Sequence, residues 1–260
     1  MTEHETIFAE ERRLQILDLL RERRKVTVAD LAALFAVTPA TIRSDLREME
    51  SKDLLMRTHG GAIEKSKTSF ELESRDREVR NLEAKRRIAQ TALAFVQDGD
   101  TIILDTGTTT LELAKLLQVR RKVTVLTNDI VIARTLEEFA AIDVVLMGGI
   151  LRKGFHCTVG AQAKLTTAGL TVDKAFLGTN SLSIERGATT PDIHQAEVKK
   201  HMVSITAKII VLCDGTKLGR VSFAQFATID QLDTLITDAV DAPTREKLEE
   251  SGVEVVIAES

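Results

Sequence analysis

Aromatic residues are scarce in this 260-residue chain, which has no tryptophan, no tyrosine and nine phenylalanines. Proteins that hold single-stranded nucleic acid stack its bases on aromatic side chains, so a platform of that kind is not expected. The chain also lacks any run approaching the roughly 20 apolar residues of a membrane-spanning helix. Its acidic N-terminus has no apolar signal core. We therefore expect neither membrane insertion nor secretion.

Cysteine and histidine are sparse as well. Cys157 and Cys213 lie far apart with no CxxC motif, which indicates ordinary buried thiols in a reducing cytoplasm. The five histidines are scattered; His194 and His201 could share a helical face, where a solvated or packing role is expected. The sequence therefore predicts no metal site and no cofactor, and a cytoplasmic location.

The charge balance excludes a general polyanion binder, because the net charge is −4. Residues 1–65 hold 11 Lys/Arg and 12 Asp/Glu, so positive charge is only local there. One copy should bind a polyanion modestly, and a homodimer or homotetramer would be needed to bind it well. The two local clusters are Arg21, Arg23, Arg24 and Lys25, and then Arg43, Arg47 and Arg57.

Residues 38–61 are the most informative stretch of the chain. Thr38 is a good N-cap, and Pro39 suits the first helical position, where a missing N–H costs nothing. The sequence therefore predicts a short amphipathic helix from here onward. Its apolar stripe at helical spacing is Ile42, Leu46 and Met49.

The opposite face of this helix carries small and basic side chains. Small side chains let a helix approach the edges of DNA bases, and arginines reach guanine edges or phosphates. This face therefore predicts a recognition helix for double-stranded DNA. His59 and Gly60, in the turn that follows, either meet a phosphate or only shape the turn. The residues assigned to DNA contact are Thr38, Ala40, Thr41, Arg43, Ser44, Arg47, Arg57, His59 and Gly60.

The flanking residues complete a winged helix-turn-helix. Leucines at helical spacing predict a first helix over Glu10–Arg23, and Thr27 caps a second over Val28–Phe35. The connection at residues 36–38 is short, as the motif requires. Residues 54–62 are expected to form a two-stranded wing. The alternative is a trihelical domain that only packs against a partner, but packing needs neither the wing nor the basic face.

Residues 64–84 are dense in charge and poor in core-forming side chains, so we interpret them as a linker, with or without a short exposed helix. Beyond them, a helix over Ala84–Val96 and a strand over Thr101–Asp105 begin an alternation of helices and short apolar strands. This alternation predicts an α/β domain with a doubly wound, mostly parallel sheet. Further strands are expected at Val123–Thr127, Val144–Met147, Ala175–Leu177, Ile209–Leu212, Thr234–Thr237 and Val253–Ile257.

Polar residues follow most of these strands, and doubly wound sheets bind ligands outside the carboxyl ends of their strands. Gly107 would let the backbone turn closely, and Thr108, Thr109 and Thr110 offer hydroxyls beside the free N–H groups of a helix start. That combination is typical of a phosphate-binding turn. For Gly148-Gly149, routine turn chemistry is an equal alternative. The other polar strand ends are Asp105, Thr127-Asn128, Gly178-Thr179-Asn180-Ser181 and Asp214-Gly215-Thr216-Lys217.

Motifs in both halves resemble the DeoR family of bacterial transcriptional regulators, in order and at matching spacing. One departure is Ser44, where the family usually carries a second arginine. One phosphate or base contact of the family is therefore not expected here. The resemblance implies a winged helix-turn-helix domain over residues 1–63, the linker over 64–84 and a sugar-phosphate sensor over 85–260. The motifs are Glu11–Leu17, Thr41–Leu46, His59–Ala62, Asp105–Thr109, Leu126–Asn128 and Phe176–Asn180.

The sensor half is similar to ribose-5-phosphate isomerase. This resemblance implies that Lys85 and Thr108–Thr110 contact a phosphate and that Lys217 contacts a sugar. It also implies that Glu197 occupies the position of the catalytic glutamate, where it meets either the ligand or only the core. The isomerase also uses an Asp-Gly-Ala-Asp segment; both of its carboxylates are missing from Leu177-Gly178-Thr179-Asn180. Enediol chemistry needs a positioned base and acid, so we expect binding without catalysis. The expected effector contacts are Lys85, Asp105, Gly107, Thr108, Thr109, Thr110, Asn128, Gly178, Asn180, Glu197 and Lys217.

The family resemblance implies a repressor of a sugar-utilisation operon that a phosphorylated sugar releases from its operator. Residues 176–192 resemble the branch that controls fructose or lactose/tagatose phosphotransferase operons, which implies an effector such as fructose 1-phosphate or tagatose 6-phosphate. Two alternatives stay open from the sequence. One is an isomerase-like enzyme with an accessory DNA-binding domain, and the missing carboxylates weigh against it. The other is a transcriptional activator or dual regulator.

Overall fold

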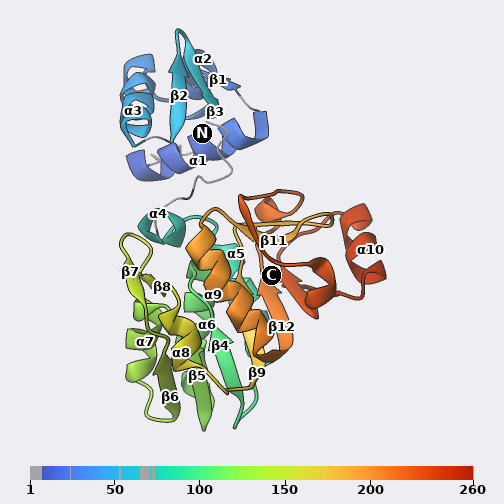
Figure 1. Cartoon of the computed structure of the whole chain (residues 1–260). Helices are drawn as coiled ribbons and strands as arrows, with labels where there is room; N and C mark the ends of the chain where they lie inside the picture. The colour runs from blue at the N-terminus through green and yellow to red at the C-terminus, as the bar shows by residue number, and fades with distance from the viewer. Residues whose placement is uncertain (1–7, 24, 53, 65–70, 72–73, 260) are drawn as a thin grey trace. The chain divides into compact units, whose positions relative to one another are not determined.

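The chain forms two compact units, one within residues 1–70 and one within residues 71–260 (Figure 1). The structure is a computed structural model, and it describes residues 8–23, 25–52, 54–64, 71 and 74–259. Each unit has its own set of buried apolar side chains. The two units are therefore described separately.

The described part of the first unit contains three helices and a three-stranded antiparallel sheet. The helices are α1 (Ala9–Arg23), α2 (Val28–Leu34) and α3 (Pro39–Ser51). The sheet has the order β1-β3-β2. The winged helix-turn-helix is confirmed, but the sheet has one strand more than predicted, because β1 pairs with β3. The strands are β1 (Lys25–Thr27), β2 (Leu55–Thr58) and β3 (Gly61–Glu64).

Both helices of the helix-turn-helix begin after a threonine cap, as predicted. The Thr27 hydroxyl oxygen accepts from the Asp30 N–H at 3.1 Å, and the Thr38 hydroxyl oxygen accepts from the Thr41 N–H at 3.1 Å. Each bond satisfies a donor that a helix start leaves without a partner, and its loss costs about 1 kcal/mol. Gly61 is required where β3 passes β1, because a Cβ there would lie 1.9 Å from a backbone oxygen.

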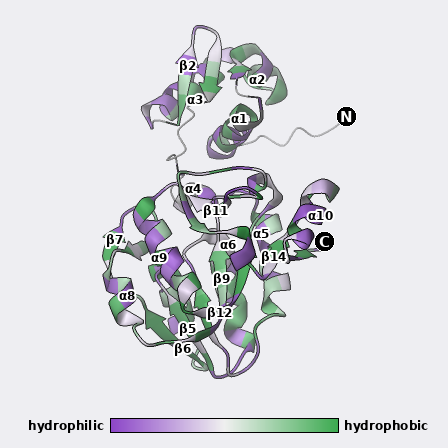
Figure 2. Ribbon diagram, turned by 45° about the vertical axis from the view of Figure 1, so that its right-hand side comes forward, coloured by the Kyte–Doolittle hydropathy of each residue, from purple (hydrophilic) through white to green (hydrophobic). Residues whose placement is uncertain are grey.

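A seven-stranded sheet forms the centre of the second unit, and all of its neighbouring strands are parallel (Figure 1). Its order is β15-β14-β12-β9-β4-β5-β6. Figure 2 shows the hydrophobic colour running along the central strands. The strands are β4 (Thr101–Leu104), β5 (Val123–Thr127), β6 (Ile142–Leu146), β9 (Val172–Gly178), β12 (Thr206–Leu212), β14 (Thr234–Thr237) and β15 (Glu254–Ile257).

Helices cover both faces of this sheet, which confirms the doubly wound α/β class. Successive residues of β4, Ile102 and Ile103, belong to two different core clusters, as expected of a strand buried on both sides. One cluster takes in α5 (Leu82–Leu93), α6 (Thr108–Leu116) and α7 (Ile130–Glu137). The other takes in α8 (Gln162–Thr166), α9 (Ile193–Ser204) and α10 (Ala242–Glu250).

The direction of chain progression across the sheet reverses beside β4. From β4 the chain moves through β5 to β6 on one side, and it then returns to β9 on the other side and continues through β12, β14 and β15. Such a switch point opens a crevice at the carboxyl ends of the strands. The sequence motifs after β4, β5 and β9 therefore meet at this place.

The predicted elements of the second unit are present, with ends that differ by up to three residues. The helix predicted over Ala84–Val96 is α5, which begins and ends earlier. Several three- and four-residue strands were not predicted, because so few residues show no clear period. They are β7 (Ile150–Arg152) and β8 (Cys157–Val159), which form a hairpin, and β10 (Ser181–Ser183), β11 (Gly187–Thr190) and β13 (Ala224–Ala227), which form a small antiparallel sheet. Single 3₁₀ turns are η1 (Leu117–Val119), η2 (Gly215–Lys217) and η3 (Ile229–Gln231).

The segment predicted as a linker over residues 64–84 overlaps the second unit, which begins at Glu71. Its second half contains α4 (Ser74–Glu78) and the start of α5. The Ser74 N–H donates to the Gly154 carbonyl at 2.9 Å, in the turn between β7 and β8. These contacts join the segment from Glu71 onward to the sheet domain. Residues 65–70 of the predicted linker lie outside the described part of the chain.

Candidate functional site

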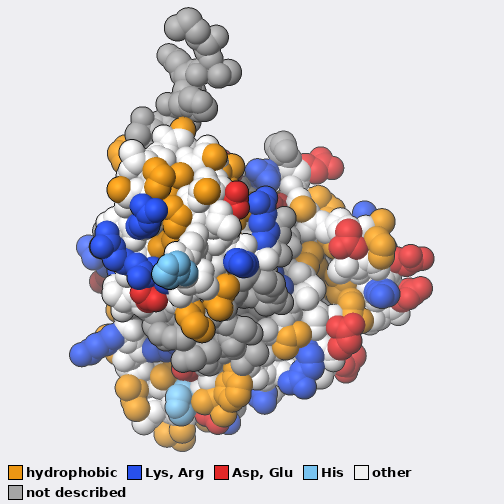
Figure 3. Space-filling model, turned by 90° about the horizontal axis from the view of Figure 1, so that it is seen from above, with side chains coloured by type: hydrophobic (Ala, Val, Ile, Leu, Met, Phe, Trp, Pro, Cys, Tyr) orange, Lys and Arg blue, Asp and Glu red, His pale blue; other side chains and the backbone are white. Residues whose placement is uncertain are grey.

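Helix α3 presents the predicted recognition face to solvent. Ala40, Arg43, Ser44 and Arg47 are exposed and Thr41 is half-buried, while the apolar stripe on the other side is buried as its spacing predicted. Neither arginine forms an ion pair with a described residue. Figure 3 shows Lys and Arg side chains gathered beside a histidine on one part of the surface. The face is thus free to meet phosphates or base edges.

A buried ion pair fixes α3 to α1. Asp45 on α3 contacts the Arg12 guanidinium at 2.7 Å and the Arg13 guanidinium at 3.2 Å, and the Asp45 and Arg12 side chains are both about nine-tenths buried. Removing one partner of a buried pair leaves an uncompensated charge. This contact was not predicted from the sequence. Its signal was an acidic residue in phase with the apolar stripe of the predicted helix.

The predicted wing contacts lie around the β2–β3 turn. His59 and Gly60 are exposed in this turn, and a Cβ at Gly60 would meet nothing within 4 Å. Arg57 on β2 is paired with Glu50 of α3 at 2.9 Å. The charge of Arg57 is therefore largely balanced within the unit, and Arg43 and Arg47 are the cations better placed to meet DNA.

The predicted ligand crevice contains a buried ion pair at the switch point. Asp105, which follows β4, has one carboxylate oxygen bonded to the Lys199 ammonium and to the Gly178 N–H, the latter at 3.1 Å. The Lys199 ammonium also donates to the Gly178 carbonyl at 2.8 Å and lies 5.0 Å from the Phe226 ring centroid. Burial raises the pKa of Asp105, and Lys199 opposes that rise. The pair joins β4, β9 and α9 beneath the crevice.

Two buried acceptor atoms at the crevice have no hydrogen-bond partner among the described residues. They are the other carboxylate oxygen of Asp105 and the side-chain oxygen of Asn128. Asn128 donates through its amide nitrogen to the Thr158 carbonyl at 3.0 Å, which orients the side chain. Leu104 and Thr127, the residues just before these two, are paired in register, so the two side chains follow neighbouring strands. Buried acceptors without donors are costly, and ligand hydroxyl groups could satisfy both.

The predicted phosphate turn forms the start of α6. The N–H groups of Thr108, Thr109 and Thr110 belong to its first turn, which leaves them without helical partners. The Thr110 hydroxyl instead bonds to the Asp105 and Gly107 carbonyls at 2.6 and 2.8 Å, so it stabilises the turn and has no proton to spare for a ligand. Gly107 has an extended backbone, so the close turn expected of it does not depend on glycine.

Lys85 and Lys217 both lie near Asp214, which follows β12. Lys217 pairs with Asp214 at 3.2 Å, and Asn81 donates to the same carboxylate at 3.2 Å. Burial alone would raise the pKa of Asp214, but Lys217 and the hydrogen bonds outweigh it and hold that pKa well below its usual range. Lys85 is 4% exposed, and burial together with the nearby Lys217 lowers its pKa to about 7. A bound phosphate would favour the charged form of Lys85.

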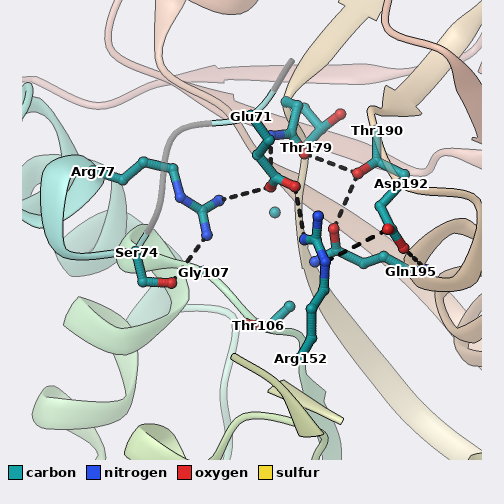
Figure 4. Close-up of polar contacts among 12 residues, drawn as sticks. Glu71, Ser74, Arg77, Thr106, Gly107, Arg152, Thr179, Thr190, Asp192 and Gln195 are labelled. Atoms are coloured by element: carbon teal, nitrogen blue, oxygen red, sulfur yellow. Dashed lines mark hydrogen bonds and ion pairs between the residues drawn. The ribbon is translucent and has the colours of Figure 1, made fainter. Parts of the chain in front are cut away.

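A carboxylate surrounded by donors borders the crevice (Figure 4). Glu71 contacts Arg152 at 2.7 Å, Arg77 at 3.4 Å and the Asn180 amide nitrogen at 3.0 Å. We call Arg77, Arg152 and Asn180 the Glu71 ring. Of its members only Asn180 was predicted as a site residue, and no local motif marks the two arginines.

Glu197, predicted at the position of a catalytic glutamate, lies on the exposed side of α9. Its contact with a ligand therefore stays a prediction. Residues 193, 197, 200 and 204 share the exposed side of α9, while Lys199 lies on the buried side. Lys199 is the residue of α9 that reaches the crevice, and it was not predicted.

Both cysteines are buried within the second unit. Burial, with a further contribution from Asp105, raises the pKa of Cys157 to about 11, and burial raises that of Cys213 to about 12. Among the described residues, no group of three or more His, Cys, Asp or Glu is arranged to hold a metal ion. No helix in the described part of the chain has both the length and the apolarity to cross a membrane.

A winged helix-turn-helix joined to a doubly wound sheet with a polar crevice defines a two-domain ligand-responsive DNA-binding protein. Residues 12–68 match the DeoR-like helix-turn-helix domain, and residues 80–239 match the DeoR C-terminal sensor domain. The chain therefore belongs to the DeoR family of transcriptional regulators, which are DNA-binding regulators and not enzymes. The alternative of an isomerase-like enzyme is thereby set aside.

Similar proteins match this chain over nearly its whole length. The HTH-type transcriptional regulator GlpR of Haloferax volcanii is 38% identical, over 95% of this chain and 96% of its own. The putative aga operon transcriptional repressor of Escherichia coli O157:H7 is 34% identical over 95% and 93%, and the repressor GlcR of Bacillus subtilis is 32% identical over 97% and 98%. A D-ribose-5-phosphate isomerase in complex with phospho-erythronic acid has a TM-score of 0.41 at 20% identity, covering 53% of this chain and 54% of its own.

Proposed function

We propose that this chain represses a sugar-utilisation operon in the cytoplasm and leaves its operator when a phosphorylated sugar binds the second unit. The observation that carries the proposal is the pair of unpartnered acceptors on Asp105 and Asn128 beside the first turn of α6. Acceptors suit the hydroxyl groups of a sugar, and the N–H groups of a helix start suit its phosphate. Lys85 and Lys217 supply positive charge near the carboxyl end of β12.

The operator is read by α3 in this proposal. Arg43 and Arg47 reach base edges or phosphates, while Ala40, Thr41 and Ser44 let the helix approach the major groove. The unit has few unpaired cations on this face, so we expect a homodimer or homotetramer to place two or more recognition helices on DNA. Two relatives, the putative aga operon regulator and GlcR, are named as repressors, which favours repression over activation here.

Release follows from a difference in ligand affinity between two arrangements of the chain. A ligand shifts an equilibrium only by as much as its affinities for the two states differ. Typical coupling of roughly 1–3 kcal/mol would weaken operator binding by about 5- to 150-fold. The proposed effector contacts are Lys85, Asp105, Gly107, Thr108, Thr109, Asn128, Gly178, Asn180, Lys199 and Lys217.

Fluorescence anisotropy on a labelled duplex from upstream of the chain's own operon tests this proposal. Protein is titrated at fixed salt, because phosphate contacts make DNA binding salt-dependent. Sugar phosphates are then added singly, beginning with fructose 1-phosphate and tagatose 6-phosphate. Release by one compound supports the repressor and identifies its inducer. Tighter binding on addition of a sugar phosphate would point to an activator or dual regulator, and the absence of specific binding would refute the proposal.

A further inference from the structure

The side chain of Glu71 is 2% exposed, and three donor side chains of the second unit surround it. Arg152 and Arg77 reach it from two sides, and Asn180 contacts one of its oxygens (Figure 4). Two guanidinium groups and an amide around two oxygen atoms are the surroundings that proteins give to a bound phosphate or carboxylate. Here the anion belongs to the chain itself.

Each donor of the Glu71 ring has a second partner, and Arg77 donates to the Ser74 hydroxyl at 3.2 Å. The Arg152 guanidinium lies 3.6 Å from the Phe155 ring centroid and 3.5 Å from the Asp192 carboxylate. The Asn180 side-chain oxygen accepts from the Thr190 hydroxyl at 3.0 Å. These contacts do not involve Glu71, so the donors would keep their positions if Glu71 left.

The ring would carry an unbalanced charge without Glu71. Its two arginines face the carboxylates of Glu71 and Asp192, so the four charges balance. Removal of Glu71 leaves one positive charge that is largely shielded from water. A phosphoryl group could restore the balance and could also accept several N–H bonds.

The ring adjoins the proposed effector crevice. Arg77 lies on α4, which packs against α6, the helix that begins at the predicted phosphate turn. The Arg77 carbonyl accepts from the Lys85 ammonium, so the ring and the lysine cluster share this residue. Asn180 follows Gly178, which is bonded to Asp105. Figure 4 shows Thr106 and Gly107 in the same close-up.

We propose that Arg77, Arg152 and Asn180 form an anion-binding site that Glu71 fills in the ligand-free chain, and that the phosphoryl group of the effector, the same group proposed to meet the first turn of α6, displaces Glu71 from it. This inference rests on the proposed function for the identity of the effector. Glu71 is the residue at which the chain enters the second unit. Its displacement therefore frees the residue at which the chain enters the sensor domain, next in sequence to the segment that leads to the DNA-binding unit.

Glu71→Gln tests the competition directly, with inorganic phosphate as the probe and chloride at equal ionic strength as the reference. The amide keeps the shape of the side chain but removes its charge. If Glu71 occupies the ring for more than nine-tenths of the time, the Kd for phosphate, measured by isothermal titration calorimetry, should fall by about tenfold or more in Glu71→Gln. Glu78→Gln, which removes a charge from the exposed side of α4, should leave it unchanged. An equal phosphate response in Glu71→Gln and the wild type would overturn the proposal.

Operator release separates this proposal from the proposed function. If sugar phosphates release the wild type and Glu71→Gln at the same concentration, and phosphate binds both alike, the anion site fails and the repressor stands. If no sugar phosphate affects operator binding but Glu71→Gln binds inorganic phosphate more tightly than the wild type, the anion site stands and the proposed function fails.

Discussion

Raising the pH from 7.5 to 8.5 should weaken the binding of the sugar phosphate by up to about tenfold, if Lys85 contacts the phosphate. Lys85 is buried beside Lys217, and its pKa is about 7 in the free chain, where Asp214 only partly offsets the burial. Its ammonium group is therefore mostly deprotonated across this range. The phosphate itself stays a dianion, because its second pKa is about 6.

The magnitude follows from the size of the pKa shift. The change from 10.5 to about 7 corresponds to about 5 kcal/mol against the charged form. A bound dianion favours the ammonium, so the pKa of Lys85 is higher in the complex than in the free chain, and a proton is taken up on binding. The contribution of the charged Lys85 to the binding affinity is complete below about pH 7. It is lost as the pH rises through the pKa that Lys85 has in the complex. At pH 8 the uptake should approach about 0.9 proton per site.

Isothermal titration calorimetry at pH 8, in two buffers with different enthalpies of ionisation, measures this uptake. Lys85→Met should bind the sugar phosphate more weakly and take up no proton. Lys115→Met, on the exposed side of α6, serves as a matched control and should behave like the wild type. If the wild type binds without proton uptake, or if Lys85→Met takes up as much as the wild type, Lys85 does not hold the phosphate.

Three other substitutions separate the DNA-binding and sensing roles. Arg43→Ala should raise the operator Kd by about 5- to 150-fold, equivalent to roughly 1–3 kcal/mol, with effector affinity unchanged; an equal loss of effector binding would indicate damage to the fold. Asp45→Asn should destabilise the first unit by about 1–3 kcal/mol, because it removes the buried carboxylate that contacts Arg12 and Arg13; urea denaturation would disprove this if the midpoint did not move. Lys217→Met should weaken release by sugar phosphate in the anisotropy assay and preserve operator binding; an unchanged response would remove Lys217 from the site.

Features specified by neighbouring residues were predictable from the sequence. The threonine caps of α2 and α3 act on N–H groups three residues away, so the local sequence contains both partners. The strands of the central sheet are long enough to show an apolar pattern, and the class of fold followed from it. The ligand crevice at their polar ends stays a prediction.

Features that depend on distant residues were not predictable. Glu71 meets Arg152 and Asn180, which lie 81 and 109 residues further along the chain, and nothing near any of the three marks the contact. Lys199 was missed for another reason. A motif match fixes a residue's place in the sequence, but the packing of α9 decides which of its sides faces Asp105, and Lys199 lies on that side.

The deep burial of Cys157 and Cys213 has a practical consequence for observing this protein. Thiol reagents attack the thiolate, and these two thiols are kept protonated and shielded from solvent. A maleimide fluorophore should therefore spare both native cysteines. It can be directed to a cysteine introduced at Val79, which is 63% exposed just after α4. The two native cysteines therefore need not be replaced before a label is attached near α4 to follow the start of the sensor domain.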